Sequence, residues 1–211
     1  MNIVLRDTAF TLLPEKALYK PDEKLLIIAD VHLGKARHFR KGGVSIPAQA
    51  QDGDYDNLRA LFNKVKPQKV YFLGDLFHSE LNNDWHDFAG LIREYHHIGF
   101  TLVRGNHDII DHELFHDLGV LVVDAIGDDR FVYSHEPLET VPNGKLNFAG
   151  HIHPGYVLSG IARQSMKLPC FYSSEEVCIL PAFGVLTGLY SMDRTKSTDI
   201  YIILPDSVRK I

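Results

Sequence analysis

The chain has 211 residues, a formal net charge of −5, 45% hydrophobic residues and 23% charged residues. This balance is typical of a soluble globular protein with a sizeable core, and we predict one domain over residues 1–211. No apolar run approaches the roughly 20 residues that a membrane span needs. The acidic balance argues against a protein that coats nucleic acid generally, although a local basic groove is compatible with it. The segment Met1–Thr8 lacks a signal-peptide pattern, so we expect a cytoplasmic protein.

The first half of the chain alternates expected strands with expected helices. Apolar runs predict strands at Lys24–Asp30, Lys69–Asp75 and Phe100–Asn106. Between them, apolar residues recur at helical spacing over Leu58–Val65 and again over Trp85–Tyr95. The order strand, helix, strand, helix, strand predicts a parallel sheet with right-handed crossovers.

Short segments of strand-forming residues fill the second half, with Gly, Pro and Ser between them. We expect them to form a second sheet packed on the first. The residues up to Pro21 are predicted to add one or two short edge strands. The expected strands of the second half are Val120–Asp124, Arg130–Ser134, Tyr156–Ile161, Lys167–Tyr172, Val177–Leu180 and Ile200–Leu204.

The two cysteines, Cys170 and Cys178, form no C-x-x-C pair and flank an expected hairpin. We expect them to be reduced and to pack as small apolar residues, with a cross-strand disulfide as the alternative.

Polar side chains follow three of the expected strands directly. The strands close with Asp30–His32, with Gly74–Asp75 and with Gly105–Asp108. In isolation the last of these could be an ordinary turn, because Gly and Asn tolerate positive φ. However, ligands bind beyond the carboxyl ends of the strands in an open parallel sheet, so we expect these side chains to converge in one crevice.

Further histidines stand later in the chain. His135 follows an expected strand, and His151 and His153 belong to the stretch AGHIHP. In an extended segment, alternation puts the last two on the same side. Together with the strand ends, these residues form a set of two carboxylates, one amide and four imidazoles. The candidate metal ligands are Asp30, His32, Asp75, Asn106, His135, His151 and His153.

This mixture of oxygen and nitrogen donors suits Mn, Fe or Zn better than Ca or Mg. Seven ligands are too many for one tetrahedral zinc, whereas they suit two metals that share a bridging carboxylate. Two ions about 3.5–4 Å apart form the clamp that phosphoryl chemistry uses. We therefore predict two divalent metal ions, with Mn as the first choice and Fe or Zn as alternatives.

The ordered series D-x-H, G-D, G-N-H-D, H and G-H-x-H, between Asp30 and Pro154, resembles the calcineurin-like metallophosphoesterases. The resemblance implies an α/β fold, namely a four-layer α/β/β/α sandwich of two mixed β-sheets flanked by helices. It implies that His107 is the catalytic histidine, while Asp108 helps to fix the loop or the imidazole from behind. The implied ligands are Asp30, His32 and His153 for one metal, Asn106, His135 and His151 for the other, and Asp75 as the bridge.

The expected mechanism is in-line attack on phosphorus by a hydroxide that the two metals generate and share. His107 would protonate the leaving alkoxide or donate a hydrogen bond to the transition state. We expect His78 to orient His107 or to contact the phosphate, and the alternative is a histidine at a helix start or on the surface.

The stretches LLIIADVHLGKARHFRKGG, GDLFHSE, RGNHD, AGHIHP, LPCF and LPAFGVLTG resemble the bacterial ligase-associated DNA damage response endonucleases. This resemblance implies DNA as the substrate, a role in DNA repair, and a DNA ligase, a helicase and an exonuclease as pathway neighbours. One alternative is a phosphoesterase for nucleotides, cyclic nucleotides or other monoesters. Another is a metal-deficient scaffold, against which the complete ligand set argues.

The segment Lys35–Gly43 carries four positive charges and no acid, and it begins three residues after His32. Its field would collect a polyanion near the metals, and Phe39 could stack on an unpaired base. The alternative is a solvated loop with Phe39 in the core. The predicted substrate-binding residues are Lys35, Arg37, Arg40 and Lys41.

Overall fold

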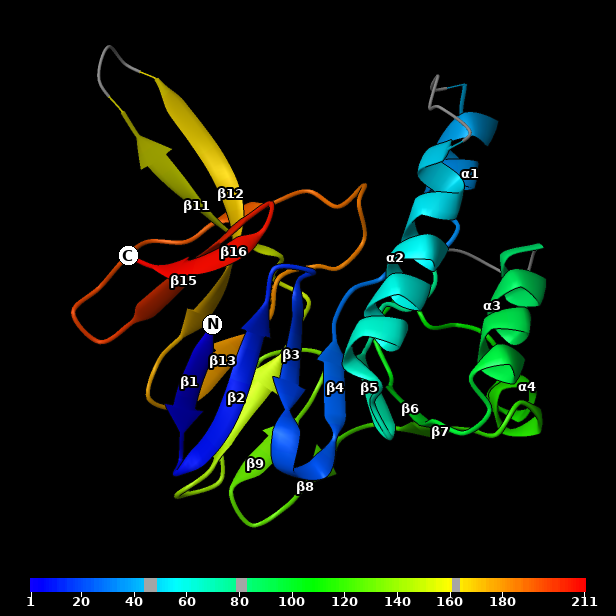
Figure 1. The fold of residues 1–211 in the computed structure, drawn as a ribbon, viewed down its shortest axis with the longest axis horizontal. Helices are drawn as coiled ribbons and strands as arrows, with labels where there is room; N and C mark the ends of the chain where they lie inside the picture. The colour runs from blue at the N-terminus through cyan, green and yellow to red at the C-terminus, as the bar shows by residue number, and fades with distance from the viewer. Residues whose placement is uncertain (44–48, 79–82, 161–163) are drawn as a thin grey trace.

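The structure, a computed structural model, describes residues 1–43, 49–78, 83–160 and 164–211. Two mixed β-sheets pack against each other, and helices lie along the first of them (Figure 1). The predicted α/β class, with two mixed sheets flanked by helices, is confirmed.

Seven strands form the first sheet, in the order β1-β2-β3-β4-β5-β6-β7. Strands β4, β5, β6 and β7 are parallel neighbours, and the first three of these were expected from the sequence. The bounds are β1 Asn2–Leu5, β2 Thr8–Leu13, β3 Ala17–Lys20, β4 Leu25–Ile28, β5 Lys69–Leu73, β6 Gly99–Val103 and β7 Val120–Val123.

Two parts of this sheet differ from the sequence prediction. The residues before Pro21 form three strands instead of one or two, and β3 is an interior strand between β2 and β4. The segment at Val120–Asp124, expected in the second sheet, pairs with β6 in the first. A helix, α4 (His112–Asp117), makes this crossover. Its six residues bury only Phe115 completely, which is too little for a periodic signal.

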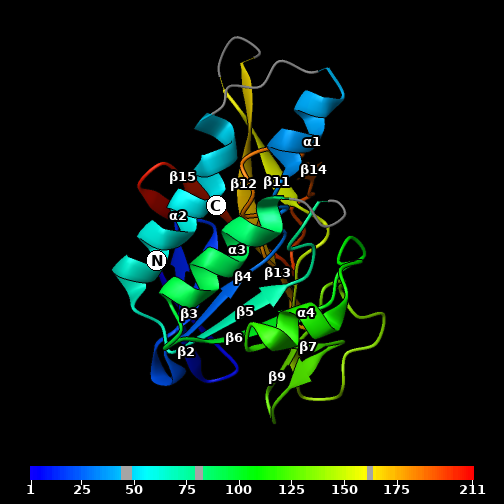
Figure 2. The same ribbon diagram turned by 90° about the vertical axis from the view of Figure 1, so that its right-hand side faces the viewer.

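All α-helices of the described ranges lie along one side of the first sheet (Figures 1 and 2). The two helices expected from apolar spacing are present as α2 and α3, and α1 lies in the basic segment Lys35–Gly43, where no helix was predicted. A short 3₁₀ helix, Pro21–Glu23, joins β3 to β4. The bounds are α1 Lys35–Lys41, α2 Gln49–Val65, α3 Asn83–Glu94 and α4 His112–Asp117.

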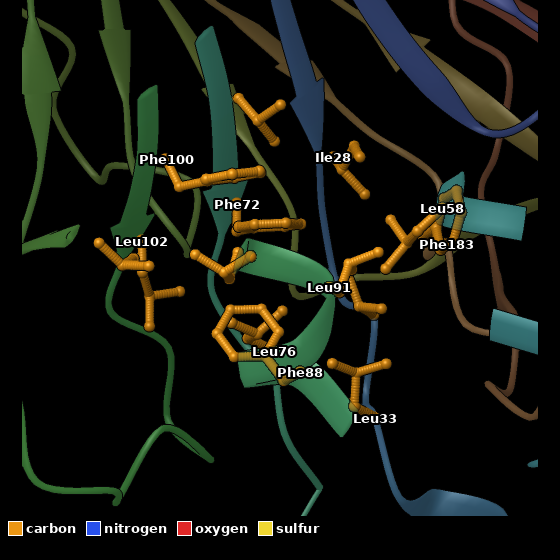
Figure 3. Packing of buried hydrophobic residues seen from close by; sticks show 14 of the residues in the cluster. Ile28, Leu33, Leu58, Phe72, Leu76, Phe88, Leu91, Phe100, Leu102 and Phe183 are labelled. Atoms are coloured by element: carbon orange, nitrogen blue, oxygen red, sulfur yellow. The ribbon is translucent and has the colours of Figure 1, made fainter. Parts of the chain in front are cut away.

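Aromatic and aliphatic side chains fill the space between the helices and the first sheet. Phe72 and Phe100 of the neighbouring strands β5 and β6 stack nearly parallel, with ring centroids 6.2 Å apart (Figure 3). Phe88 and Leu91 of α3 and Leu58 of α2 are fully buried against this layer. Burial of each such side chain stabilises the fold by about 1.5–3 kcal/mol, so the strand ends emerge from a rigid core.

The second sheet has nine strands, and its main path runs β14-β11-β12-β13-β10-β9-β8, while β15 pairs with β12 and with β16. Five strands expected from the sequence are present, although Ile161 at the end of one lies outside the described residues. The central strand β10 was missed because it is short and contains the buried polar residue Asn147. The bounds are β8 Ile126–Gly127, β9 Phe131–Tyr133, β10 Leu146–Ala149, β11 Pro154–Ser159, β12 Ser165–Ser173, β13 Val177–Ile179, β14 Tyr190–Ser191, β15 Asp199–Leu204 and β16 Ser207–Lys210.

The two sheets share a core. On β4, Leu26 and Ile28 face the helices, whereas Leu25 and Ile27 pack against residues of the second sheet. A strand covered on both faces is apolar throughout, as the run in β4 is. Within the described residues, the outer face of the second sheet carries no α-helix. A smaller apolar cluster around Cys170 lies on this face instead. The predicted four-layer sandwich places its second helical layer at this position.

Both cysteines are free and buried, as the sequence predicted. Cys178 lies in the core between the sheets, while Cys170 belongs to the cluster on the outer face. Burial raises the pKa of each thiol to about 12, so both stay neutral and unreactive.

Gly90 offers a test of the helix assignment at α3. It lies exposed in the helix interior, and an added Cβ would have open space around it. Gly90→Ala should therefore stabilise the protein by about 0.5–1 kcal/mol, measured by urea unfolding. Gly119→Ala is the control, because Gly119 has φ of +76° and the same change there should destabilise. A loss of stability in Gly90→Ala would contradict the helix at this position.

Candidate metal centre

The predicted site residues gather where parallel strands of both sheets end. In the first sheet, β4, β5 and β6 lead into Asp30, Asp75 and Asn106. In the second, the parallel neighbours β9 and β10 lead into His135 and His151. Because both sheets direct carboxyl ends of parallel strands to one place, residues more than a hundred positions apart become neighbours.

One cluster of potential ligands consists of Asp30, His32 and His153. The Nε2 atoms of His32 and His153 are 3.4 Å apart, and Nε2 of His153 is 3.6 Å from Oδ1 of Asp30. Asp30 is fully buried, and its carboxylate accepts the backbone N–H of His151.

The second cluster consists of Asp75, His135 and His151. Nδ1 of His151 lies 3.1 Å from Nε2 of His135, which in turn lies 3.4 Å from Oδ1 of Asp75. Nδ1 of His135 faces the carbonyl oxygen of Leu73 at 3.0 Å. A carbonyl can only accept, so Nδ1 carries the proton and Nε2 directs its lone pair into the cluster.

Asp75 stands between the two clusters. Its Oδ1 faces His135, while its Oδ2 lies 3.7 Å from Nε2 of His32 in the first cluster. Oδ1 also accepts the backbone N–H of His107 at 3.0 Å. The carboxylate is buried and fixed, with one oxygen turned toward each cluster.

The donor chemistry fits divalent cations. Burial lowers the pKa of His32 to about 2, with a further contribution from Lys35, so its imidazole is neutral and keeps a free lone pair. In both clusters, imidazole nitrogens and a carboxylate oxygen converge within 4.8 Å of one another. Such closely spaced lone pairs and negative charge are stabilised by a borderline metal ion.

The backbone at the site is strained. Five of the seven predicted ligands have a positive φ, a conformation that costs a non-glycine residue on the order of 1–3 kcal/mol. Strain of this kind persists where the surrounding structure imposes it, and it concentrates at functional sites. The residues are Asp30 (53°), His32 (51°), Asp75 (49°), His151 (66°) and His153 (53°).

This backbone conformation corrects one sequence argument. The segment from Gly150 to His153 is not extended, and the N–H of Ile152 donates to the carbonyl of Gly150 at 2.7 Å in a tight turn. The turn sends His151 to one cluster and His153 to the other, instead of placing both on one side.

Gly105 is required for the close approach of two loops. A Cβ at this position would lie 2.3 Å from the backbone nitrogen of Asp75. The G-N-H-D stretch is therefore a turn, and as a turn it brings Asn106 and His107 beside Asp75.

Asp108 fixes this turn from below. Its buried carboxylate accepts backbone N–H groups from Gly105 and Leu76, both at 2.9 Å, and from Phe77 at 3.4 Å. Burial raises the pKa of this carboxyl, while the three amides act in the opposite direction. Of the two predicted roles for Asp108, these contacts correspond to fixing the loop, and they join it to the loop that carries Asp75.

His107 is exposed at the opening of the site. Its ring centroid is 5.6 Å from that of His32 and 5.7 Å from that of His78, to which it is nearly parallel. His78 is half-buried and also lies beside Phe39, with 6.2 Å between their ring centroids. The structure thus brings both predicted catalytic histidines to the edge of the first cluster.

Asn106 is exposed, and its side chain contacts Glu136, a residue that the sequence analysis missed. Nδ2 of Asn106 donates to Oε1 of Glu136 at 2.7 Å. The same oxygen lies 4.0 Å from Nε2 of His151. Glu136 directly follows His135 in the sequence, but no motif spacing distinguishes it.

The basic segment Lys35–Gly43 begins as the helix α1, and two of its cations contact other groups of the protein. Arg37 pairs with Asp84 at 3.4 Å and with Asp87 at 3.7 Å, so this guanidinium ties α1 to α3. Nε of Arg40 donates to the carbonyl of Ala36. Lys35 is half-buried within the field of Asp75 and Asp30, and the side chain of Lys41 lies outside the described residues.

A family model, the calcineurin-like phosphoesterase, matches residues 23–176 and includes every residue of the two clusters. The chain belongs to the calcineurin-like phosphoesterases. A solved structure of similar fold is the Pseudomonas putida nuclease MPE, with a TM-score of 0.81 and 27% identity. That alignment covers 100% of this chain and 99% of the nuclease. No curated protein matches the chain significantly.

As a member of this family, the chain is a metal-dependent phosphoesterase, and the family's binuclear site corresponds to the two neighbouring clusters. No helix among the described residues is long and apolar enough to cross a membrane.

Asp108→Asn tests the support of this phosphoesterase site. An asparagine retains one acceptor oxygen but turns an NH₂ group toward a backbone donor, so a buried amide loses its partner. We expect a loss of about 1–3 kcal/mol in urea unfolding. Asp111→Asn is the matched control, because Asp111 caps α4 and asparagine caps equally well. Equal stability of the two variants would contradict the support role of Asp108.

Proposed function

We propose that this chain is a two-metal nuclease that hydrolyses phosphodiester bonds in DNA. The observation that carries the proposal is the position of Asp75, with one carboxylate oxygen toward each cluster. We assign Asp30, His32 and His153 to one metal and Asp75 as the bridge. We assign Asn106, His135 and His151 to the other metal.

When bound, two divalent cations supply Lewis acidity toward phosphoryl oxygens and lower the pKa of a water molecule toward neutrality. We propose Mn as the native metal, with Fe or Zn as alternatives, because the ligands mix carboxylate, amide and imidazole donors. The buried, neutral imidazole of His32 keeps its lone pair at any pH near neutrality.

His107 is proposed to act on the leaving group. Its backbone N–H is anchored on Asp75, which holds its exposed imidazole beside the clusters. From there a ring nitrogen can give a proton to the leaving oxygen or donate a hydrogen bond to the transition state. The nearly parallel ring of His78 restricts the orientation of His107, and this positioning is the role that we assign to His78.

Support for a DNA substrate comes from the similar Pseudomonas putida nuclease and from the positive charges of α1 near the site. We place this activity in the cytoplasm and in DNA repair, beside a DNA ligase, a helicase and an exonuclease. The role in DNA repair and the three pathway neighbours follow only from the sequence resemblance to ligase-associated endonucleases.

Two substitutions separate ligand from catalyst. His107→Ala should keep both metals while turnover of a chromogenic phosphodiester with Mn²⁺ falls by roughly 10²–10⁴. Asp75→Asn should lose activity together with at least one metal, because it removes charge from the shared bridge. Metal analysis by mass spectrometry checks both. Two ions per chain in Asp75→Asn, or metal loss in His107→Ala, would contradict the assignments.

The basic helix α1 separates a polymeric from a small substrate. Lys35→Ala and Arg40→Ala should raise KM for DNA and reduce the salt dependence by roughly one unit of slope per lost contact. Hydrolysis of a small chromogenic diester should change little. Arg37→Ala is the control, because it removes the ion pairs to Asp84 and Asp87. It should lower the stability of the protein, while the ratio of DNA cleavage to hydrolysis of the small diester stays unchanged.

Equal damage to both substrates would mean that Lys35 and Arg40 support the metal site. An absence of damage to either would favour the alternative function, a phosphoesterase for nucleotides, cyclic nucleotides or monoesters.

A further inference from the structure

Glu136 contacts two proposed ligands of the same metal. Oε1 of its exposed side chain accepts a hydrogen bond from Nδ2 of Asn106 at 2.7 Å and lies 4.0 Å from Nε2 of His151. The hydroxyl of Ser134 donates to the backbone carbonyl of Glu136 at 2.6 Å and so fixes the chain at this point. Glu136 therefore sits on the outer side of the second cluster.

The hydrogen bond between Asn106 and Glu136 determines the orientation of the Asn106 amide. A carboxylate can only accept, so the group that faces Glu136 must be the NH₂ of Asn106. The amide oxygen then points away from Glu136 and is available as a ligand. Because the bond is charge-assisted and short, it resists the opposite orientation, in which the amide would face a metal with its NH₂ group.

The negative charge of Glu136 lies on the side of His151 that faces away from the cluster. Nδ1 of His151 faces the cluster, 3.1 Å from Nε2 of His135, while Nε2 faces Glu136. At 4.0 Å the carboxylate acts through its charge and not through a direct hydrogen bond: it favours the tautomer with the proton on Nε2, which leaves the lone pair of Nδ1 for the metal. Carboxylate partners of this kind orient ligating imidazoles and raise their basicity.

We propose that Glu136 is a positioning residue for one of the two metals, through the amide of Asn106 and the imidazole of His151. The inference rests on the proposed two-metal function. Within the described parts of the chain, Glu136 forms no hydrogen bond or ion pair with the first cluster of Asp30, His32 and His153. Its effect should therefore be confined to one metal, and this asymmetry distinguishes positioning from general support.

The test is a calorimetric titration of the metal-free protein with Mn²⁺. The wild type should bind two equivalents. In Glu136→Ala, one equivalent should bind about 10- to 100-fold more weakly while the other keeps its affinity. The affinity of Glu136→Gln for this equivalent should lie between those of the wild type and Glu136→Ala. A glutamine can also donate to the oxygen of Asn106, so it no longer determines the orientation of that amide. Excess Mn²⁺ should restore the activity of Glu136→Ala.

Glu139→Ala is the matched control, since Glu139 is an exposed carboxylate in the same segment. It should bind both equivalents as the wild type does, and thermal unfolding of the metal-free variants should be unchanged. Two equivalents of wild-type affinity in Glu136→Ala would overturn the inference. Equal weakening of both, with a lower Tm of the metal-free protein, would also overturn it. Fewer than two equivalents in the wild type would instead overturn the two-metal function itself.

Discussion

The architecture of the site depends on one buried carboxylate. Asp75 accepts the backbone N–H of His107 and turns its two oxygens toward His135 and His32. Each of these neighbours belongs to a different loop, and His135 comes from the other sheet. A carboxylate so placed in a buried environment carries a cost unless positive charge compensates it. Two metal ions would provide that compensation, and this requirement explains why imidazoles converge on the same point.

The loops maintain this arrangement although the backbone conformation of several site residues is unfavourable. Five site residues adopt positive φ, and each costs on the order of 1–3 kcal/mol. Beyond the strand ends, the N–H of His32 donates to the carbonyl of Asp75 at 2.9 Å, and that of Gly184 donates to Asp30 at 3.1 Å. Asp108 adds its bonds to both neighbouring loops. The strain is sustained because two packed cores hold the strands from which the loops emerge.

Much of the site could be predicted because its signal is local. A buried run that stops at Asp30 or Asp75 identifies both a strand and its functional end, and parallel strand order then brings such ends together. The tight turn through His151 and His153 was not predicted, because alternation assumes an extended chain. The role of Arg37 was also hidden, since its partners Asp84 and Asp87 lie on α3, nearly fifty residues later.

Other features depend on contacts that no local pattern encodes. Glu136 is adjacent to a predicted ligand, but its hydrogen-bond partner, Asn106, lies thirty residues earlier. The interior position of β3 and the assignment of β7 to the first sheet follow from pairing choices between strands that look alike in sequence. Short elements such as α4 and β10 contain too few residues for a periodic signal.

The most direct measurement of the central claim is anomalous diffraction from crystals of the protein grown with Mn²⁺. The two-metal account predicts two anomalous peaks about 3.5–4 Å apart, with the carboxylate of Asp75 between them. The metal ion at one peak should be coordinated by Asp30, His32 and His153, and the metal ion at the other by Asn106, His135 and His151. A single peak, or two peaks that do not share Asp75, would contradict the account.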